Sequence, residues 1–237
     1  MIRVVVLVDN ESRNHRLKGA YGLSLYIEYE TTYLVFDTGP SSDLLQLNAE
    51  ALNVDMELID GVIVSHIHSD HVGGMPYIGW VSPYTKVYIP YDSLLSLGRT
   101  ARSHGLVPVE VSEWMNPWPS VYVSKPVSGP PWEHFLVIED SGRLVVFSGC
   151  MHPGVAKTLS EISTYFEDKR IYGVIGGFHL ANAPKKHVLK AIDSLVYTYG
   201  VRKVVPLHCS GELFKSILSK EYPDIYVEAG VGATVEF

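Results

Sequence analysis

The stretch Ser65-His66-Ile67-His68-Ser69-Asp70-His71-Val72-Gly73-Gly74 places three histidines and one aspartate within six consecutive positions. Neutral imidazoles and ionised carboxylates are the ligands that zinc and similar divalent metals take from proteins. The mostly apolar segment 59–64 before it predicts a buried strand, so the cluster lies on the loop at that strand's carboxyl end. Ligands bind at such strand ends in α/β sheets. The stretch therefore predicts a metal site in an α/β protein rather than a chance group of surface histidines.

Composition and charge limit the function classes. The chain has 237 residues, of which 46% are hydrophobic and 19% are charged, as in an ordinary globular enzyme. Its net charge of −7 argues against nucleic acid as a partner, because phosphate backbones favour clustered Lys and Arg. The apolar residues 1–8 are too short to span a membrane and lack the cleavage site of a signal peptide. We therefore expect a cytoplasmic protein with no membrane partner. Cys150 and Cys209 are too few for a disulfide framework.

The hydrophobic pattern predicts a strand-rich first half and a second half in which strands and helices alternate. Expected strands cover residues 1–8, 21–30, 32–36, 59–64, 86–90, 135–139, 144–148, 171–175, 203–207, 225–227 and 233–237. Six helices are expected. One begins after Ser41 or Ser42, one covers 75–80, one begins at Asp92, two cover 155–166 and 184–199, and a short one follows residue 211. No change in composition marks a linker, so we expect a single domain over residues 1–237.

Residues 99–133 form the least regular part of the chain. They contain three of the four tryptophans and many prolines, which a central strand does not tolerate well. We expect edge strands and long loops there. This segment is either a structural cover over one side of the sheet or a wall or lid over the site.

Ligand-type residues recur at the ends of other apolar strands. Beside the histidine cluster, these residues are Asp37, the Cys150–His152 pair, His179 and His208. Strands of one sheet put their carboxyl ends along one edge, so these distant residues can converge.

Two of these motifs together resemble the metallo-β-lactamase superfamily. They are Asp37-Thr38-Gly39 and, downstream, His66-x-His68-x-Asp70-His71 followed by Gly73-Gly74. The resemblance covers essentially the whole chain and implies an αββα four-layer sandwich, an α/β fold. It also implies two divalent metal ions as cofactors, which we expect to be zinc, with manganese or iron as alternatives.

The resemblance assigns a role to each member of the two motifs. It places His66 and His68 on one metal, and Asp70 and His71 on a second. It gives Asp37 the task of supporting the ligand loop through hydrogen bonds. A simple structural turn at Asp37 is the alternative.

The later motifs depart from the common pattern of the superfamily. Many members carry an aspartate that bridges both metals where this chain has Cys150, after Gly149. Many also have a metal-one histidine on an earlier loop, but the only histidine there, His134, falls inside an expected strand. His152 is the better substitute. His208 matches the final histidine of the family, a ligand of metal two.

Three sequence motifs resemble those of a subgroup of archaeal and bacterial proteins. This subgroup is related to the methanopterin-pathway synthase that joins a dihydropterin to ribofuranosylaminobenzene phosphate. The motifs are Gly149-Cys150-x-His152-Pro153-Gly154, Gly176-Gly177-Phe178-His179-Leu180 and Pro206-x-His208-Cys209-x-Gly211. This likeness makes His179 a candidate ligand, acid/base or hydrogen-bond donor to substrate. Cys150 is either a thiolate ligand or a small buried residue, and we expect Cys209 to be structural.

The expected activity is hydrolysis of an ester, phosphoester or lactone through a metal-activated water. Asp70 is placed to orient the nucleophile as well as to bind metal, and His179 is a second candidate catalytic residue. We expect a small-molecule substrate. A phosphate group on it is one option, because Lys185 and Lys186 start a helix soon after His179.

Three other functions are compatible with the sequence. The subgroup adds group transfer on a phosphorylated or pterin substrate. A di-iron redox centre and a non-catalytic metal-binding protein are the others. Nothing in the sequence predicts the oligomeric state.

Overall fold

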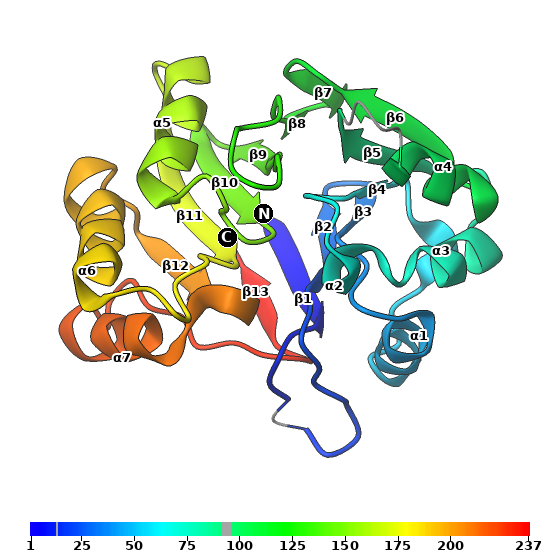
Figure 1. Ribbon diagram of the computed structural model, residues 1–237, viewed down its shortest axis with the longest axis horizontal. Coiled ribbons are helices and arrows are strands. Elements are labelled where there is room, and N and C mark those ends of the chain that lie inside the picture. The colour runs from blue at the N-terminus through cyan, green and yellow to red at the C-terminus, as the bar shows by residue number, and fades with distance from the viewer. Residues whose placement is uncertain (13, 92–95) are drawn as a thin grey trace.

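The computed structural model describes residues 1–12, 14–91 and 96–237. Two β-sheets pack face to face, and helices cover the outer face of each sheet, so that four layers follow one another from left to right in Figure 1. This arrangement confirms the αββα sandwich that the resemblance implies.

The first sheet has seven strands. In spatial order they are β13 (Thr234–Glu236), β1 (Ile2–Val8), β2 (Ser24–Tyr29), β3 (Thr32–Phe36), β4 (Gly61–Ile63), β5 (Lys86–Pro90) and β6 (Val107–Val111). Strands β3 to β6 are parallel, and β1 runs the same way because β2 is antiparallel to both β1 and β3. The helices on its outer face are α1 (Ser42–Ala51), α3 (Met75–Val81) and α4 (Ser96–Ser103) (Figure 1).

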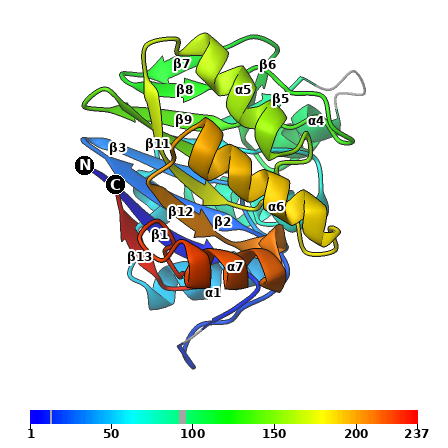
Figure 2. The ribbon, with the colours of Figure 1, turned by 90° about the vertical axis from the view of Figure 1, so that its left-hand side faces the viewer.

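The second sheet has six strands. In spatial order they are β12 (Lys203–Pro206), β11 (Arg170–Gly176), β10 (Arg143–Ser148), β9 (Leu136–Asp140), β8 (Val121–Val123) and β7 (Met115–Trp118). Strands β10, β11 and β12 are parallel. Figure 2 shows the helices across its outer face, α5 (Val155–Tyr165), α6 (Lys185–Asp193) and α7 (Glu212–Glu221). No helix in the described part of the chain is both long and apolar enough to cross a membrane.

The central strands are buried on both faces, which explains their continuous apolar runs. In β1, Val6 points into the core between the sheets, whereas Leu7 points toward the α1 side. In β10, Phe147 lies between the sheets and Val146 points toward the α5 side. Successive side chains of a strand point to opposite faces, so one apolar run contributes to two cores.

The segment rich in Pro and Trp supplies the outermost strand at one edge of each sheet, β6 and β7. This confirms the expected edge strands, but the end of α4 (residues 99–103) and the inner strand β8 also lie in this segment, where long loops were expected. Pro108 lies in β6 and Pro117 in β7. Proline cannot donate a ladder hydrogen bond, and an edge strand has one side on which none is needed.

Two expected elements differ from the observed ones. The helix expected over 184–199 ends at Asp193 and continues as a π-helical turn, η2 (Ser194–Thr198). Residues 196–199 are β-branched or aromatic and are therefore weak helix formers. The strand expected at 225–227 is only an isolated bridge between Val204 and Tyr226, because the chain then leaves for the first sheet.

The position of His134 also differs from the prediction. It precedes β9, and its backbone N–H donates to the carbonyl oxygen of Ser65, which belongs to the ligand loop of the other sheet, rather than to a neighbouring strand. The predicted helix start at Asp92 lies outside the described residues.

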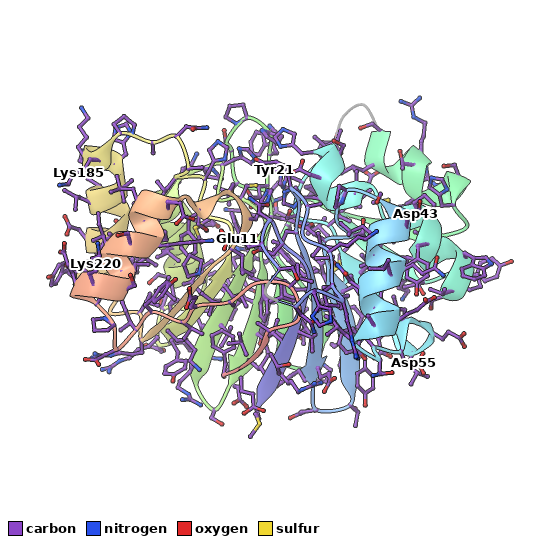
Figure 3. The ribbon with its side chains drawn as sticks, turned by 90° about the horizontal axis from the view of Figure 1, so that it is seen from below. Glu11, Tyr21, Asp43, Asp55, Lys185 and Lys220 are labelled. Carbon is purple, nitrogen blue, oxygen red and sulfur yellow. The ribbon has the colours of Figure 1, made fainter. Side chains whose placement is uncertain are left out.

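The parallel strands of both sheets end at one edge of the sandwich. Ligand-type side chains follow six of them: Asp9 after β1, Asp37 after β3, the His66 cluster after β4, Cys150 and His152 after β10, His179 after β11, and His208 after β12. Tyr21 marks this edge at the top of Figure 3, where its ring centroid lies 4.5 Å from that of His208. Asp55 lies toward the opposite edge.

Two glycines join the ligand loop to the turn that follows β3. A Cβ atom on Gly73 would lie 2.1 Å from the carbonyl oxygen of Pro40, and one on Gly74 would lie 2.2 Å from that of Thr38. A backbone carbonyl cannot move aside as a flexible side chain can, so only glycine fits at either position. The two sequence motifs are therefore in direct packing contact.

We expect Gly73→Ala to destabilise the protein by about 1–3 kcal/mol or more, because the added methyl group would overpack two backbone segments. The matched control is Gly98→Ala in α4, where a Cβ atom would meet nothing closer than 3.6 Å. Alanine at that helical position should stabilise the protein by about 0.5–1 kcal/mol. Urea unfolding followed by circular dichroism measures both changes. A Gly73→Ala variant as stable as the parent protein would contradict this contact.

Candidate metal centre

Three imidazole nitrogens from both sheets converge at the first donor group. The Nε2 atom of His66 lies 3.1 Å from Nδ1 of His68 and 3.3 Å from Nε2 of His152. Two nitrogens on one tetrahedral zinc ion lie about 3.4 Å apart, given Zn–N distances of about 2.0–2.1 Å. These three side chains therefore fit a single divalent ion.

The second donor group combines a carboxylate with two imidazoles. Oδ2 of Asp70 lies 3.4 Å from Nε2 of His71 and 3.2 Å from Nε2 of His208. The Nε2 atom of His208 is buried and has no hydrogen-bond partner among the described residues. A buried polar atom without a partner is costly, and a metal ion would satisfy this one.

Polar side chains hold the outer nitrogens of the second group. Asp37 Oδ2 accepts a hydrogen bond from Nδ1 of His71 at 2.6 Å, and Asp37 also accepts from the backbone N–H and the hydroxyl of Ser65, each at 2.7 Å. The Nδ1 atom of His208 lies 3.0 Å from Oδ1 of Asn10. These contacts fix the ring orientations and leave Nε2 of both histidines toward the centre.

Asn10 and its neighbour Asp9 had no predicted role in the site. Asp9 Oδ1 accepts the backbone N–H of His208 at 2.6 Å, and the side-chain amide of Asn10 donates to the carbonyl oxygen of His208 at 2.9 Å. Both residues follow strand β1 directly, so the strand-end argument applied to the other site residues also identifies them.

Cys150 lies between the two donor groups. Its Sγ atom is 3.4 Å from Nε2 of His71, and it forms a compact group with His66 and His71 in which all ligand atoms lie within 4.8 Å of one another. The cysteine is buried. A hydrogen bond with Cys209, together with burial, raises the pKa of the Cys150 thiol.

His179 borders the first group on the solvent side. Its exposed ring has its centroid 4.4 Å from that of His152, and its backbone N–H donates to Sγ of Cys209 at 3.2 Å. Cys150, His179 and Cys209 form a further compact group of potential ligand atoms. The structure thus brings every predicted site residue to one edge, but metal binding and catalysis by these residues stay predictions.

Glu133 supports the second-sheet side of the site and was missed at the sequence level. It is fully buried, and its carboxylate accepts three backbone N–H groups: from Cys150 at 2.8 Å, Met151 at 3.0 Å and His152 at 2.8 Å. Burial raises the pKa of Glu133 to about 7, against the effect of these hydrogen bonds. No motif marks this residue, because it lies in the irregular segment far from the loop that it holds.

The two donor groups differ in proton content. Burial, with the neighbouring histidines, lowers the pKa of His66, and it lowers the pKa of His152 to about 4. Burial also acts to lower the pKa of His71, but the carboxylates of Asp37 and Asp70 raise it to about 10. At neutral pH these two imidazoles of the first group are therefore neutral, whereas His71 holds an extra proton.

Four residues of the site have left-handed backbone angles although none is glycine. The φ angles are 57° at Asp37, 56° at Met151, 53° at His179 and 50° at His208. Such conformations are unfavourable for residues with a Cβ atom and persist where the surroundings enforce them, often at functional sites. The turns after β3, β10, β11 and β12 are thus all shaped to present side chains at this edge.

We expect Glu133→Gln to destabilise the protein by about 1–3 kcal/mol, because one amide oxygen cannot satisfy three buried N–H groups and the amide NH₂ would face donors. Chemical denaturation measures the loss. Glu113→Gln is the matched control, since Glu113 is exposed in the same segment and its substitution should change stability by less than about 0.5 kcal/mol. Equal stability of the two variants would show that Glu133 does not hold the loop.

Comparisons with known proteins agree with this geometry. The model of the metallo-beta-lactamase superfamily matches residues 17–174. The chain is similar to 7,8-dihydropterin-6-methyl-4-(beta-D-ribofuranosyl)-aminobenzene-5'-phosphate synthase of Methanocaldococcus jannaschii, at 26% identity over 97% of this chain and 94% of that protein.

Solved structures show the same fold along the whole chain. Tm1679, described as a metal-dependent hydrolase of the β-lactamase superfamily, is 25% identical and has a TM-score of 0.84, covering 100% of this chain and 99% of its own. Zn²⁺-bound PqqB of Methylobacterium extorquens is 14% identical with a TM-score of 0.66, covering 99% of this chain and 100% of its own, a likeness of fold alone. Motifs, architecture and family model agree, and the chain belongs to the metallo-β-lactamase superfamily.

Proposed function

We propose that the chain is a metal-dependent hydrolase that cleaves an ester, phosphoester or lactone bond in a small molecule. The observation that carries the proposal is the pair of adjacent donor groups, each with three ligand atoms within 4.8 Å of one another. The likeness to Tm1679 supports the same reaction class. A single domain over residues 1–237 and a cytoplasmic location stay predictions.

The proposed cofactors are two divalent ions, zinc first, with iron or manganese as alternatives. The first would be held by His66, His68 and His152, the second by Asp70, His71 and His208, and Cys150 lies within reach of both. When bound, such ions supply an acidified water and polarise the bond to be cleaved.

Asp70 and His179 are the proposed catalytic side chains. Burial acts to raise the pKa of Asp70, but the imidazoles of His208 and His71, whose Nε2 atoms lie 3.2 and 3.4 Å from its Oδ2, bring it below the usual range. The partly exposed carboxylate is therefore ionised and can orient a water molecule. A hydrogen bond with Cys209 raises the pKa of His179. The exposed His179 ring can therefore carry a proton for the leaving group near neutral pH.

Group transfer is the second candidate function, because the M. jannaschii relative is named as a synthase. The same residues would then hold and activate a phosphorylated or pterin substrate, and an acceptor molecule would take the place of water. Product analysis separates the two reactions: a hydrolase gives an alcohol and an acid, whereas a synthase joins two substrates.

We expect the zinc-loaded protein to hydrolyse at least one of three model compounds, a γ-lactone, an aryl ester and bis(4-nitrophenyl) phosphate. Chelation should abolish the activity. His152→Ala should lower it more than about a hundredfold, since even residues that only support metal ligands are worth about 10–100-fold. His15→Ala, at an exposed histidine far from the motifs, is the control. Full activity after complete metal removal would reject the proposal.

The zinc affinities of the two donor groups should also depend differently on pH. Because the pKa of His71 is raised to about 10, the metal-free second group holds a proton that the metal must displace, so its affinity should rise about tenfold per pH unit between pH 6 and 8. The pKa values of His66 and His152 are lowered, to about 4 for His152, so the first group should bind with nearly constant affinity in that range. Zinc calorimetry in buffers of different ionisation enthalpy counts the released protons. Identical pH slopes for both equivalents would contradict the assignment.

A further inference from the structure

Two cavities of different chemistry border the donor groups. One, of about 500 Å³, lies between the turn after β10, the start of α5 and helix α6, and both His152 and His179 line it. The other, of about 390 Å³, is lined by Ile67, the residue between His66 and His68, and by side chains near α4 and in the 126–132 loop. In Figure 1, α5 and α6 lie on the left and α4 on the right, with α2 (Ser69–Val72), which carries Asp70 and His71, between them.

The cavity beside α5 and α6 is cationic. Lys157, Lys190 and His187 line it together with the two site histidines, and no lining residue is acidic. This contrasts with the chain as a whole, which has a net charge of −7. Lys157 and Lys190 are exposed, and Nζ of Lys157 donates one hydrogen bond, to the carbonyl oxygen of Ser128 at 2.7 Å, which leaves two of its donors available. Lys185 and Lys186, expected at the sequence level to meet a phosphate, do not line it.

The cavity beside α4 is apolar and aromatic. Its described lining consists of Ile67, Tyr91, Trp132, Leu97, three prolines and one serine, with no charged residue. Ile67, Tyr91 and Trp132 are 41%, 53% and 56% exposed, although large apolar side chains are normally covered. Exposed aromatic faces that share a cavity are suited to stack on a flat ring.

We propose that the substrate of the metal centre is an elongated small molecule with an anionic group at one end and an apolar ring at the other. The anion, a phosphate or a carboxylate, lies in the Lys157/Lys190 cavity, and the ring lies against Trp132 and Ile67. The bond to be cleaved lies between them, beside the donor groups. This inference rests on the proposed function for the reaction, but the binding of the two ends is independent of turnover.

Charge and position both favour this division. An anion gains charge-assisted hydrogen bonds from lysines, and it would be left without partners in the apolar cavity. Transfer of the ring from water into the apolar cavity is favourable, because its apolar surface is then covered by apolar side chains. The cationic cavity offers the ring less apolar surface. Each cavity includes a residue of, or next to, the first donor group, namely His152 on one side and Ile67 on the other. A molecule that occupies both cavities would therefore have its middle part beside the first donor group.

The test is calorimetry on zinc-loaded protein with 2-naphthyl groups joined to a phosphate monoester by alkyl chains of increasing length. Affinity should pass through a maximum with chain length and should exceed that of 2-naphthol or inorganic phosphate alone by at least about a hundredfold, since tethered groups bind with high effective concentration. Lys157→Gln/Lys190→Gln should weaken the best ligand and inorganic phosphate about tenfold or more, and leave 2-naphthol unchanged. Trp132→Ala should weaken the best ligand and 2-naphthol several-fold, and leave phosphate unchanged.

Lys185→Gln/Lys186→Gln is the matched control, because it removes the same charge from the exposed start of α6 outside the cavity. It should change each affinity by less than about twofold. The inference is overturned if the control weakens phosphate as much as the Lys157/Lys190 variant does, if phosphate ignores both lysine pairs, or if the tethered ligands bind no better than their fragments.

Turnover of the γ-lactone, the aryl ester and bis(4-nitrophenyl) phosphate in the same preparations tests the proposed function separately. Tethered binding as described without any turnover rejects only the hydrolase. Turnover together with ligand binding that neither Lys157→Gln/Lys190→Gln nor Trp132→Ala changes rejects only the proposal that the anion and the ring bind in separate cavities.

Discussion

The site depends on one buried carboxylate. Asp37 is fully buried, and its two oxygens accept hydrogen bonds from the backbone and hydroxyl of Ser65 and from Nδ1 of His71. A buried carboxylate is stable only when its oxygens accept such hydrogen bonds, so the loss of one of these contacts would leave a buried charge with too few partners. The carboxylate thereby fixes both ends of the ligand loop. It also reaches the second sheet, because a Cβ atom on Gly149 would lie 2.0 Å from Oγ of Ser65 and 3.0 Å from Oδ2 of Asp37.

Glu133 has the equivalent task on the second sheet. Its carboxylate gathers three successive N–H groups at the turn after β10, which carries Cys150 and His152. The donors of the first group come from both sheets, so the 3.3 Å spacing between Nε2 of His66 and Nε2 of His152 requires both turns to be fixed. Two buried carboxylates, one for each sheet, meet this requirement where side-chain packing alone would leave flexible loops free to shift.

The amino-acid sequence predicts those parts of the fold and of the site that follow from local patterns of residues. Apolar runs predict the strands that carry the site, and because parallel strands end at one edge, the residues after β3, β4, β10 and β12 converge as expected. Asp9 and Asn10 follow the same rule after β1, but Asn10 begins a polar stretch typical of a plain surface loop, which obscured this signal. Glu133 follows no local rule, because its partners at 150–152 lie beyond the β9–β10 hairpin and no sequence spacing predicts such a contact. The end of helix α6 is a different case, because the weak helix formers at 196–199 are a local signal for its change to a π-helical turn.

Cys150 is the departure from the common pattern of the superfamily that lies nearest to both donor groups. The sulfur lies where many members of the superfamily have a bridging carboxylate, 3.4 Å from Nε2 of His71 and close to His66. A hydrogen bond with Cys209 and burial raise the pKa of the Cys150 thiol, whereas the same hydrogen bond lowers the pKa of Cys209. Divalent cations reverse this effect on Cys150, because they deprotonate a thiol that they contact. A thiolate is a softer ligand than a carboxylate, and it favours zinc or iron over manganese or magnesium. A sulfur ligand at this one position would thus favour zinc or iron among the proposed metals without changing the fold that presents it.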